Sequence, residues 1–298
     1  MSQPAVPRTL LCVHPHPDDE SIACGGVLAR ATEERIRGVV VTCTGGEEGE
    51  NLAGIDLGDT PLLEHRRREL ADALAALGVQ HHHWLGYRDS GMRDSAANTH
   101  PDSFHLAEVD EAAALLATII RVERPQVVVS DDRTGTYGHP DHVKAYQVTV
   151  RAVALAADPE APVDGPPWQV AKRYVHTLGR GRLEAGHRAL LDAGLASPFG
   201  EEVDDTEDPV AIPFGSPDDQ ITTEIDVTPW LDRKRAALAA HRSQIASDSF
   251  FLNIPPELTQ RFFGVEQFIL EEGEPGPVQP EDDLFAGLGA AGTAASRG

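Results

Sequence analysis

The strongest constraint on the fold is an alternation, repeated along the first half of the chain, of short apolar runs with segments of helical spacing. The runs are rich in β-branched residues, as expected of buried strands. Strands that alternate with helices predict a parallel sheet covered on both faces. We therefore expect an α/β, Rossmann-like fold with a mostly parallel sheet. The expected strands are residues 8–14, 38–44, 79–85 and 126–130, and the expected helices are residues 21–37, 62–77, 107–123 and 142–157.

The second half of the chain follows a looser pattern, with a strand near 169–177, a helix near 181–195, an acidic loop at 197–219, a strand at 220–227 and a helix at 228–246. We predict a Rossmann-like catalytic domain over 1–158 and a smaller C-terminal subdomain over 159–271 that completes and covers the site. Residues 272–298 are rich in Pro, Gly, Ala and acidic residues and predict a mobile tail. Whether Leu284 and Phe285 dock on the body is left open.

The charge of the chain argues against nucleic acid as a partner. It has 48 acidic and 25 basic residues, a formal charge of −23. Nucleic-acid binders carry a basic stripe that displaces counterions from phosphates, and only the short run at 66–68 is of that kind. We expect no nucleic-acid partner. No apolar run reaches the length of about 18 residues that crosses a bilayer, and no export signal is visible, so no membrane contact is expected. The oligomeric state is not indicated.

The chain has three cysteines, Cys12, Cys24 and Cys43. They cannot all pair, and their neighbours are typical of buried strand or helix positions, so we expect no disulfide framework. Free thiols fit a reducing compartment. The sequence therefore predicts a cytoplasmic location.

Two clusters of His and Asp follow expected strands. The first is HPHPDDE at 14–20, and the second is YGHPDH at 137–142. In parallel sheets the reactive groups lie beyond the carboxyl ends of the strands, so the sheet brings such loops side by side. A catalytic zinc takes about three His or carboxylate ligands and leaves one position open for water. We predict His16, Asp19 and His142 as the ligands of one Zn²⁺, and Fe²⁺ or another divalent ion would accept the same donors.

These two motifs resemble those of the PIG-L/LmbE-like family of zinc-dependent N-acetylglucosaminide deacetylases. Further stretches resemble its mycothiol-pathway members, the N-acetylglucosaminyl-inositol deacetylase and the mycothiol S-conjugate amidase. The likeness runs from about residue 8 to the C-terminus. The matching stretches are VTCTGGEEGE (41–50), RDSGM (88–92), RPQVVVSDDRTGTYGHPDH (124–142), AAHRSQI (239–245) and DLFAGLG (283–289).

The resemblance implies a set of catalytic roles. His16, Asp19 and His142 match the family's metal ligands, and Asp18 matches its general base. His139 matches the residue that stabilises the oxyanion and protonates the leaving amine, held as imidazolium by Asp141. Tyr137 is an expected oxyanion donor or gate, with simple packing as the alternative. An alternative for Asp18 is a purely structural role, in which it only caps the following helix.

Glu50, Arg66 and Asp89 match family residues that contact the sugar and inositol, and solvated surface charge is the alternative for each. Two departures stand out. Many relatives carry Gly-Gly before the Tyr-Gly-His motif, where this chain has Thr134-Gly135-Thr136. The amidase carries Lys just after its DDES, where Ala23 stands here, although FFLNIPPELTQRFFGVEQFIL (250–270) resembles the amidase strongly.

The sequence thus predicts metal-dependent hydrolysis of the acetamide of an N-acetylglucosaminide, with N-acetylglucosaminyl-inositol as the preferred small-molecule amino-sugar substrate. The alternatives are a mycothiol S-conjugate amidase, a deacetylase of another N-acetylglucosaminide and a non-catalytic zinc-stabilised binding module. The run at 81–83 (HHH) is interpreted as structural, because alternate strand residues point to opposite faces. No phosphate-binding loop or serine nucleophile motif is present, so no nucleotide cofactor is expected.

Overall fold

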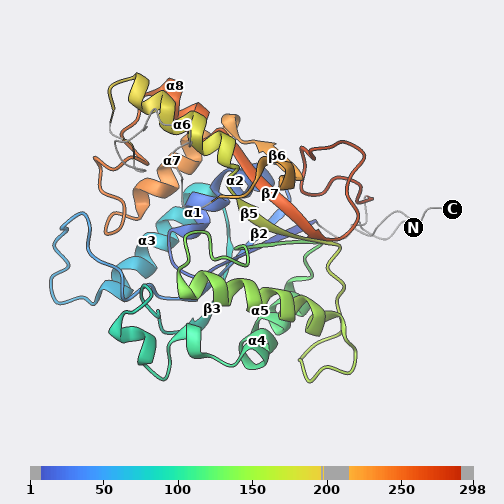
Figure 1. Ribbon diagram of the computed structural model, residues 1–298. Coiled ribbons are helices and arrows are strands. Elements are labelled where there is room, and N and C mark those ends of the chain that lie inside the picture. The colour runs from blue at the N-terminus through green and yellow to red at the C-terminus, as the bar shows by residue number, and fades with distance from the viewer. Residues whose placement is uncertain (1–7, 196, 198–214, 290–298) are drawn as a thin grey trace.

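The computed structural model describes residues 8–195, 197 and 215–289 (Figure 1). Its seven-stranded sheet has the order β3-β2-β1-β4-β5-β7-β6. Strands β1 to β5 run parallel, and β7 runs antiparallel to both of its neighbours. The expected α/β fold with a mostly parallel sheet is confirmed. The strands are β1 (Thr9–His14), β2 (Arg37–Thr44), β3 (His81–Tyr87), β4 (Val127–Ser130), β5 (Lys172–Thr177), β6 (Thr223–Asp226) and β7 (Val265–Glu272).

Helices cover both faces of the sheet (Figure 1). One apolar cluster joins β1 to α2, α3 and α7, and the other joins β1, β2 and β4 to α4 and α5. Along β1 the side chains alternate, so Leu10 and Cys12 enter the first cluster while Leu11 and Val13 enter the second. The helices are α1 (Asp19–Ala23), α2 (Gly25–Glu33), α3 (Leu62–Leu77), α4 (Val109–Glu123), α5 (Pro140–Ala157), α6 (Arg180–Asp192), α7 (Leu231–Ala240) and α8 (Pro256–Phe263). None of the helices in the described ranges is long and apolar enough to cross a membrane.

The strand order reverses between β1 and β4. From β1 the chain adds β2 and β3 on one side, then returns to place β4 on the other. The crevice beyond the carboxyl ends of strands at such a reversal is where open α/β sheets bind ligands. The two His/Asp clusters follow β1 and β4, so the topology brings both to this crevice.

Residues beyond 158 extend the same sheet. β5 pairs with β4, and β7 lies between β5 and β6. The antiparallel strand β7 was not predicted, and the helix expected at 228–246 is shorter, ending at Ala240. The division into a catalytic domain and a covering subdomain stays a prediction.

Part of the stretch expected to be a tail packs against the sheet. Leu284 and Phe285 join the cluster around β1, with exposed fractions of 4% and 3%. The Glu281 carboxylate lies 2.6 Å from Lys172 Nζ and accepts a hydrogen bond of 2.6 Å from the Tyr174 hydroxyl. Residues 290–298 and most of the acidic loop lie outside the described residues.

Replacing Glu281 by Gln should lower the free energy of unfolding by about 3 kcal/mol at neutral pH, because Lys172 then stays buried without its counter-charge. Although burial raises the pKa of Glu281, its contacts with Lys172 and Tyr174 hold that pKa below its usual range. The stabilisation is therefore present above a pH of about 4.3 and is lost as the pH falls. Denaturant titrations of both proteins at neutral and acid pH test this.

Asp282→Asn is the matched control, because Asp282 is the exposed neighbour. Equal losses in the two variants would contradict the role of the buried pair.

Candidate active site

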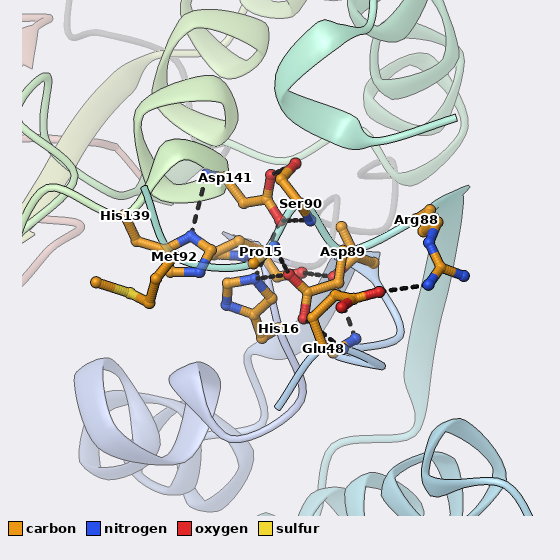
Figure 2. Close-up of polar contacts among 12 residues, drawn as sticks. Pro15, His16, Glu48, Arg88, Asp89, Ser90, Met92, His139 and Asp141 are labelled. Atoms are coloured by element: carbon orange, nitrogen blue, oxygen red, sulfur yellow. Dashed lines mark hydrogen bonds and ion pairs between the residues drawn. The ribbon is translucent and has the colours of Figure 1, made fainter. Parts of the chain in front are cut away.

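The candidate site lies at the reversal of strand order. Figure 2 shows His16, Asp89, Ser90, His139 and Asp141 gathered in one place. His16 and Asp18 lie in the loop after β1, and Asp19 begins α1. The loop after β4 supplies Tyr137 and His139, and α5 begins just after His139. Asp89 and Ser90 follow β3 and reach the same crevice. Loops from three parallel strands thus converge on one point.

The three predicted metal ligands lie together. Asp19 Oδ2 is 3.4 Å from His16 Nδ1 and 3.6 Å from His142 Nε2. Two ligands bound at 2.0–2.1 Å with tetrahedral geometry lie about 3.4 Å apart, so these separations fit a zinc-sized ion. His16 and His142 are buried, with exposed fractions of 6% and 3%. Two imidazoles and one carboxylate suit a divalent ion with a position left for water.

The other ring nitrogen of each histidine faces a buried carboxylate. His16 Nε2 lies 3.2 Å from Asp141 Oδ2, and His142 Nδ1 lies 2.6 Å from Asp131 Oδ1. If these nitrogens carry the protons, both rings present an unprotonated nitrogen towards Asp19. Carboxylates in this position fix the tautomer and orientation of metal-binding histidines. The donor set therefore fits a metal ion.

Asp131→Asn should weaken metal binding 10- to 100-fold, the usual cost of losing such a carboxylate. Competition with a chelator measures the affinity. Asp132→Asn is the control, because the Asp132 carboxylate bonds Thr134 and Thr136 within its own loop. Unchanged affinity in the Asp131 variant would show that His142 needs no partner.

Asp18 is held in an unusual conformation beside this cluster. Its φ of 119° is rare for a residue with a side chain. Glu20 Oε2 accepts a hydrogen bond of 2.9 Å from its backbone N–H, and Arg66 Nη2 donates one of 3.1 Å to its carboxylate. The Asp18 side chain makes no capping hydrogen bond to α1, so the structure does not support a purely capping role. Burial raises the pKa of Asp18 to about 6, with Arg66 opposing the rise and Asp19 adding to it.

Asp18 is supported by a contact between α1 and α7 that the sequence does not indicate. Glu20 Oε1 lies 2.8 Å from His241 Nε2, and both side chains are fully buried. Glu20 thus connects the backbone of Asp18 to the end of α7. The AAHRSQI stretch contains His241, but nothing in its spacing indicates a partner in α1.

The structure contradicts one predicted contact. The Asp141 carboxylate does not orient His139, because it contacts His16 and accepts hydrogen bonds from the Ser90 backbone and hydroxyl. The bond between Asp141 and His139 instead runs from the Asp141 backbone N–H to His139 Nδ1, at 3.1 Å. Burial lowers the pKa of His139 to about 4. Because Nδ1 accepts the Asp141 N–H, the neutral ring carries its proton on Nε2.

Tyr137 lies at the mouth of the site. It is 52% exposed, and its hydroxyl is 3.4 Å from His142 Nε2. The preceding Thr136 has a φ of 60°, a left-handed conformation that glycine adopts freely and other residues adopt rarely. Asp132 Oδ1 accepts a hydrogen bond of 3.2 Å from the Thr136 backbone and so supports this turn.

The three predicted substrate contacts differ in their surroundings. Asp89 is 3% exposed, 3.5 Å from His16 Nε2, and accepts hydrogen bonds from the Gly91 and Glu48 backbones. Arg66 is buried against Asp18 and the Pro17 carbonyl, so it is not a solvated surface charge. Glu50 is exposed in the loop after β2, directly after Gly49, which lies against Arg66. The structure brings Asp89 and Arg66 to the cluster, and a substrate contact of Glu50 stays a prediction.

Asp131, His176 and Ser90 were also missed as parts of the site. Asp131 comes directly after the strand QVVVS, a position that could have identified it. His176 Nε2 lies 3.0 Å from Asp131 Oδ1, a contact that follows from the pairing of β5 with β4. The histidines of the HHH run have other partners, among them Thr42 for His82 and Glu123 for His83.

Comparisons with known proteins identify the family of this chain. Residues 11–153 match the sequence profile of the PIG-L family, described as GlcNAc-PI de-N-acetylase. The 1D-myo-inositol 2-acetamido-2-deoxy-alpha-D-glucopyranoside deacetylase of Acidothermus cellulolyticus is 45% identical over 94% of this chain and 95% of its own length. The chain belongs to the PIG-L family. A protein of the same name from Thermobifida fusca is 45% identical over 94% of the chain and 99% of its own length.

Solved structures have a similar fold. A conserved protein from Thermus thermophilus has a TM-score of 0.55 at 25% identity and covers 92% of this chain and 98% of its own. The N,N'-diacetylchitobiose deacetylase from Pyrococcus horikoshii has a TM-score of 0.58 at 21% identity and covers 88% and 83%. The likeness to the Pyrococcus structure supports the fold alone.

Proposed function

We propose that this PIG-L protein is a metal-dependent hydrolase that removes the acetyl group from N-acetylglucosaminyl-inositol, giving acetate and a free amine. The observation that carries the proposal is the cluster of His16, Asp19 and His142 beside Asp18, in a chain about as long as relatives named for this deacetylation. The geometry supports amide hydrolysis, and the relatives' names support the substrate.

In the first step water attacks the amide carbonyl, and the candidate ligands and Asp18 have different roles in it. Held by His16, Asp19 and His142, a divalent metal would polarise the amide carbonyl and lower the pKa of a bound water to about 7. Asp18 is the carboxylate placed to take the proton from the attacking water. Arg66 and the contact of Glu20 with the Asp18 backbone hold it in position. We propose zinc as the metal, since two imidazoles and a carboxylate form a typical zinc set.

His139 and Tyr137 donate hydrogen bonds to the amide carbonyl oxygen, which becomes negatively charged as water attacks. His139 Nδ1 accepts the Asp141 backbone N–H, so in the neutral ring Nε2–H is free to donate to that oxygen. The Tyr137 hydroxyl, 3.4 Å from His142 Nε2, is a second donor. This assignment replaces the expected imidazolium with a neutral donor, and Asp18 then carries the proton to the leaving amine.

Substrate preference is tested by the release of primary amine from the zinc-loaded protein on N-acetylglucosaminyl-inositol and on a mycothiol S-conjugate, side by side. Preference for the first substrate supports the proposal, and preference for the second would make the protein an amidase. If neither substrate yields amine while metal is bound, the substrate assignment is wrong. Other N-acetylglucosaminides are then the next substrates to assay. Metal bound by four protein ligands, with no turnover on any substrate, would indicate a binding module.

We also propose that the predicted subdomain over 159–271 completes the site rather than forming a separate unit. His241 and His176 support this proposal, because they contact Glu20 and Asp131 respectively. The three buried free cysteines support a cytoplasmic location, where thiols stay reduced.

A further inference from the structure

A second group of metal-ligating side chains lies beneath the candidate active site. Cys12, His14 and Cys24 each offer one ligand atom, and these atoms lie within 4.8 Å of one another. All three residues have an exposed fraction of 0%. We call them the thiol cluster. It shares no residue with the ligand set of His16, Asp19 and His142, and the proposed reaction does not use it.

The local fold explains why these residues meet. Cys12 and His14 are two positions apart on β1, so both side chains point to the same face of the sheet. Cys24 separates α1 from α2 and is the residue at which the expected single helix is divided. Because α2 packs against that face of β1, the Cys24 thiol is brought towards Cys12.

The polar atoms of the cluster interact mainly with one another. Among the described residues, neither ring nitrogen of His14 has an oxygen or nitrogen hydrogen-bond partner, although the ring is fully buried, and its partner is the Cys12 thiol, which also interacts with Cys24. An unsatisfied buried polar group destabilises the fold, and such groups are found where an ion or a water binds. The cysteines are free thiols. Asp131 and His176 also lie within ligand distance of His14, but they already pair with each other.

The surroundings favour one class of ion. Cys12 and Cys24 belong to an apolar cluster that includes Val27, Leu28 and Val40, where an uncompensated charge is costly. Two thiolates and a neutral imidazole neutralise a divalent cation, whereas a monovalent one would leave a net negative charge. Thiolate ligands select soft or borderline metals over Mg²⁺ or Ca²⁺.

We propose that the thiol cluster binds a second, thiophilic divalent cation of the zinc class through Cys12 Sγ, Cys24 Sγ and one ring nitrogen of His14. This ion would have a structural role. It would tie β1 to the start of α2, on either side of the segment that carries His16, Asp18 and Asp19. Ion binding releases the thiol protons to solvent and involves no oxidation.

Titration of the full-length, metal-free, reduced protein with Co²⁺ tests the proposal. The His/Asp site has no sulfur ligand, so only the thiol cluster can give a near-ultraviolet sulfur-to-cobalt charge-transfer band. We expect this band to grow in with one cobalt equivalent, beside a second equivalent bound without it. A folded protein that reaches saturation with no such band would overturn the proposal. So would a count of one free thiol, instead of three, in protein denatured without reductant, because Cys12 and Cys24 would then form a disulfide.

Substitutions identify the residues that give rise to the charge-transfer band. The double variant Cys12→Ser, Cys24→Ser should lose it, while Cys43→Ser should keep it, because Cys43 is equally buried but lies in the cluster on the other face of the sheet. If the double variant fails to fold, the titration of the unsubstituted protein still decides. His142→Ala should keep the band, so failure of the His/Asp site and failure of the thiol cluster give different results.

Discussion

Asp18→Asn should lower the rate of deacetylation by about 10²- to 10⁴-fold, the usual contribution of a positioned acid or base. The substitution keeps the size of the side chain and leaves His16, Asp19 and His142 in place, but an amide cannot take a proton from the attacking water. Metal content should therefore stay at the level of the unsubstituted protein. Turnover under saturating substrate, measured beside metal analysis, separates loss of chemistry from loss of the ion.

The control for Asp18→Asn is Asp59→Asn, which removes an exposed carboxylate from the loop after β2. Its rate should match that of the unsubstituted protein. Full activity of the Asp18 variant would rule out Asp18 as the base, and loss of metal would show instead that its carboxylate helps to hold the ion.

His142→Ala should reduce the metal content by one equivalent per chain and abolish turnover. The substitution removes one of three ligands and leaves the Asp131 carboxylate buried without His142 as a partner. The protein should also become less stable, because the buried Asp131 carboxylate then keeps only His176 of its two histidine partners. Metal analysis after dialysis, together with a thermal melt, measures both effects.

A matched control for His142→Ala is His100→Ala, which removes an exposed histidine from the loop after β3. It should retain the full metal content. An unchanged metal content in the His142 variant would show that the ligand set is wrong, and would direct attention to the neighbouring group of His16, Asp89 and His139.

The sequence predicts the β1 to β4 core and the main site because both depend on local signals. Strand and helix periods identify the elements, and the rule for parallel sheets then brings together the loops that follow β1 and β4. His16, Asp19 and His142 could be chosen before any contact was known, since their residue types and positions at strand ends suffice. Asp18 lies beside them for the same reason.

The features that sequence analysis missed depend on partners far along the chain. Strand β7 contains Glu266 and Gln267, whose polar side chains interrupt its apolar run. In the structure Glu266 accepts hydrogen bonds from the Gly26 and Val27 backbones, and Gln267 accepts one from Gly179. Polar residues in such a run are usually predicted to face solvent. They are buried here because backbone groups distant in sequence supply their hydrogen-bond partners.

The same reason explains the incorrect pairing of Asp141 with His139. The two residues are neighbours in sequence, and the resemblance implied that the carboxylate serves the ring. Ser90, which comes from the loop after β3, offers both its backbone N–H and its hydroxyl to that carboxylate. His16 completes the set. No periodicity or motif in the sequence indicates a contact among residues of three different loops.

The pairing of Glu20 with His241 has a consequence for the order of events during synthesis. The two residues are 221 positions apart, whereas every side chain expected to hold the active-site metal precedes residue 143. Chains fold as they emerge from the ribosome, beginning with the N-terminal part. A nascent chain can therefore gather all its metal ligands well before His241 has been made, and the conformation of Asp18 is secured only afterwards. We therefore expect ion binding and the positioning of Asp18 to be separate steps during synthesis.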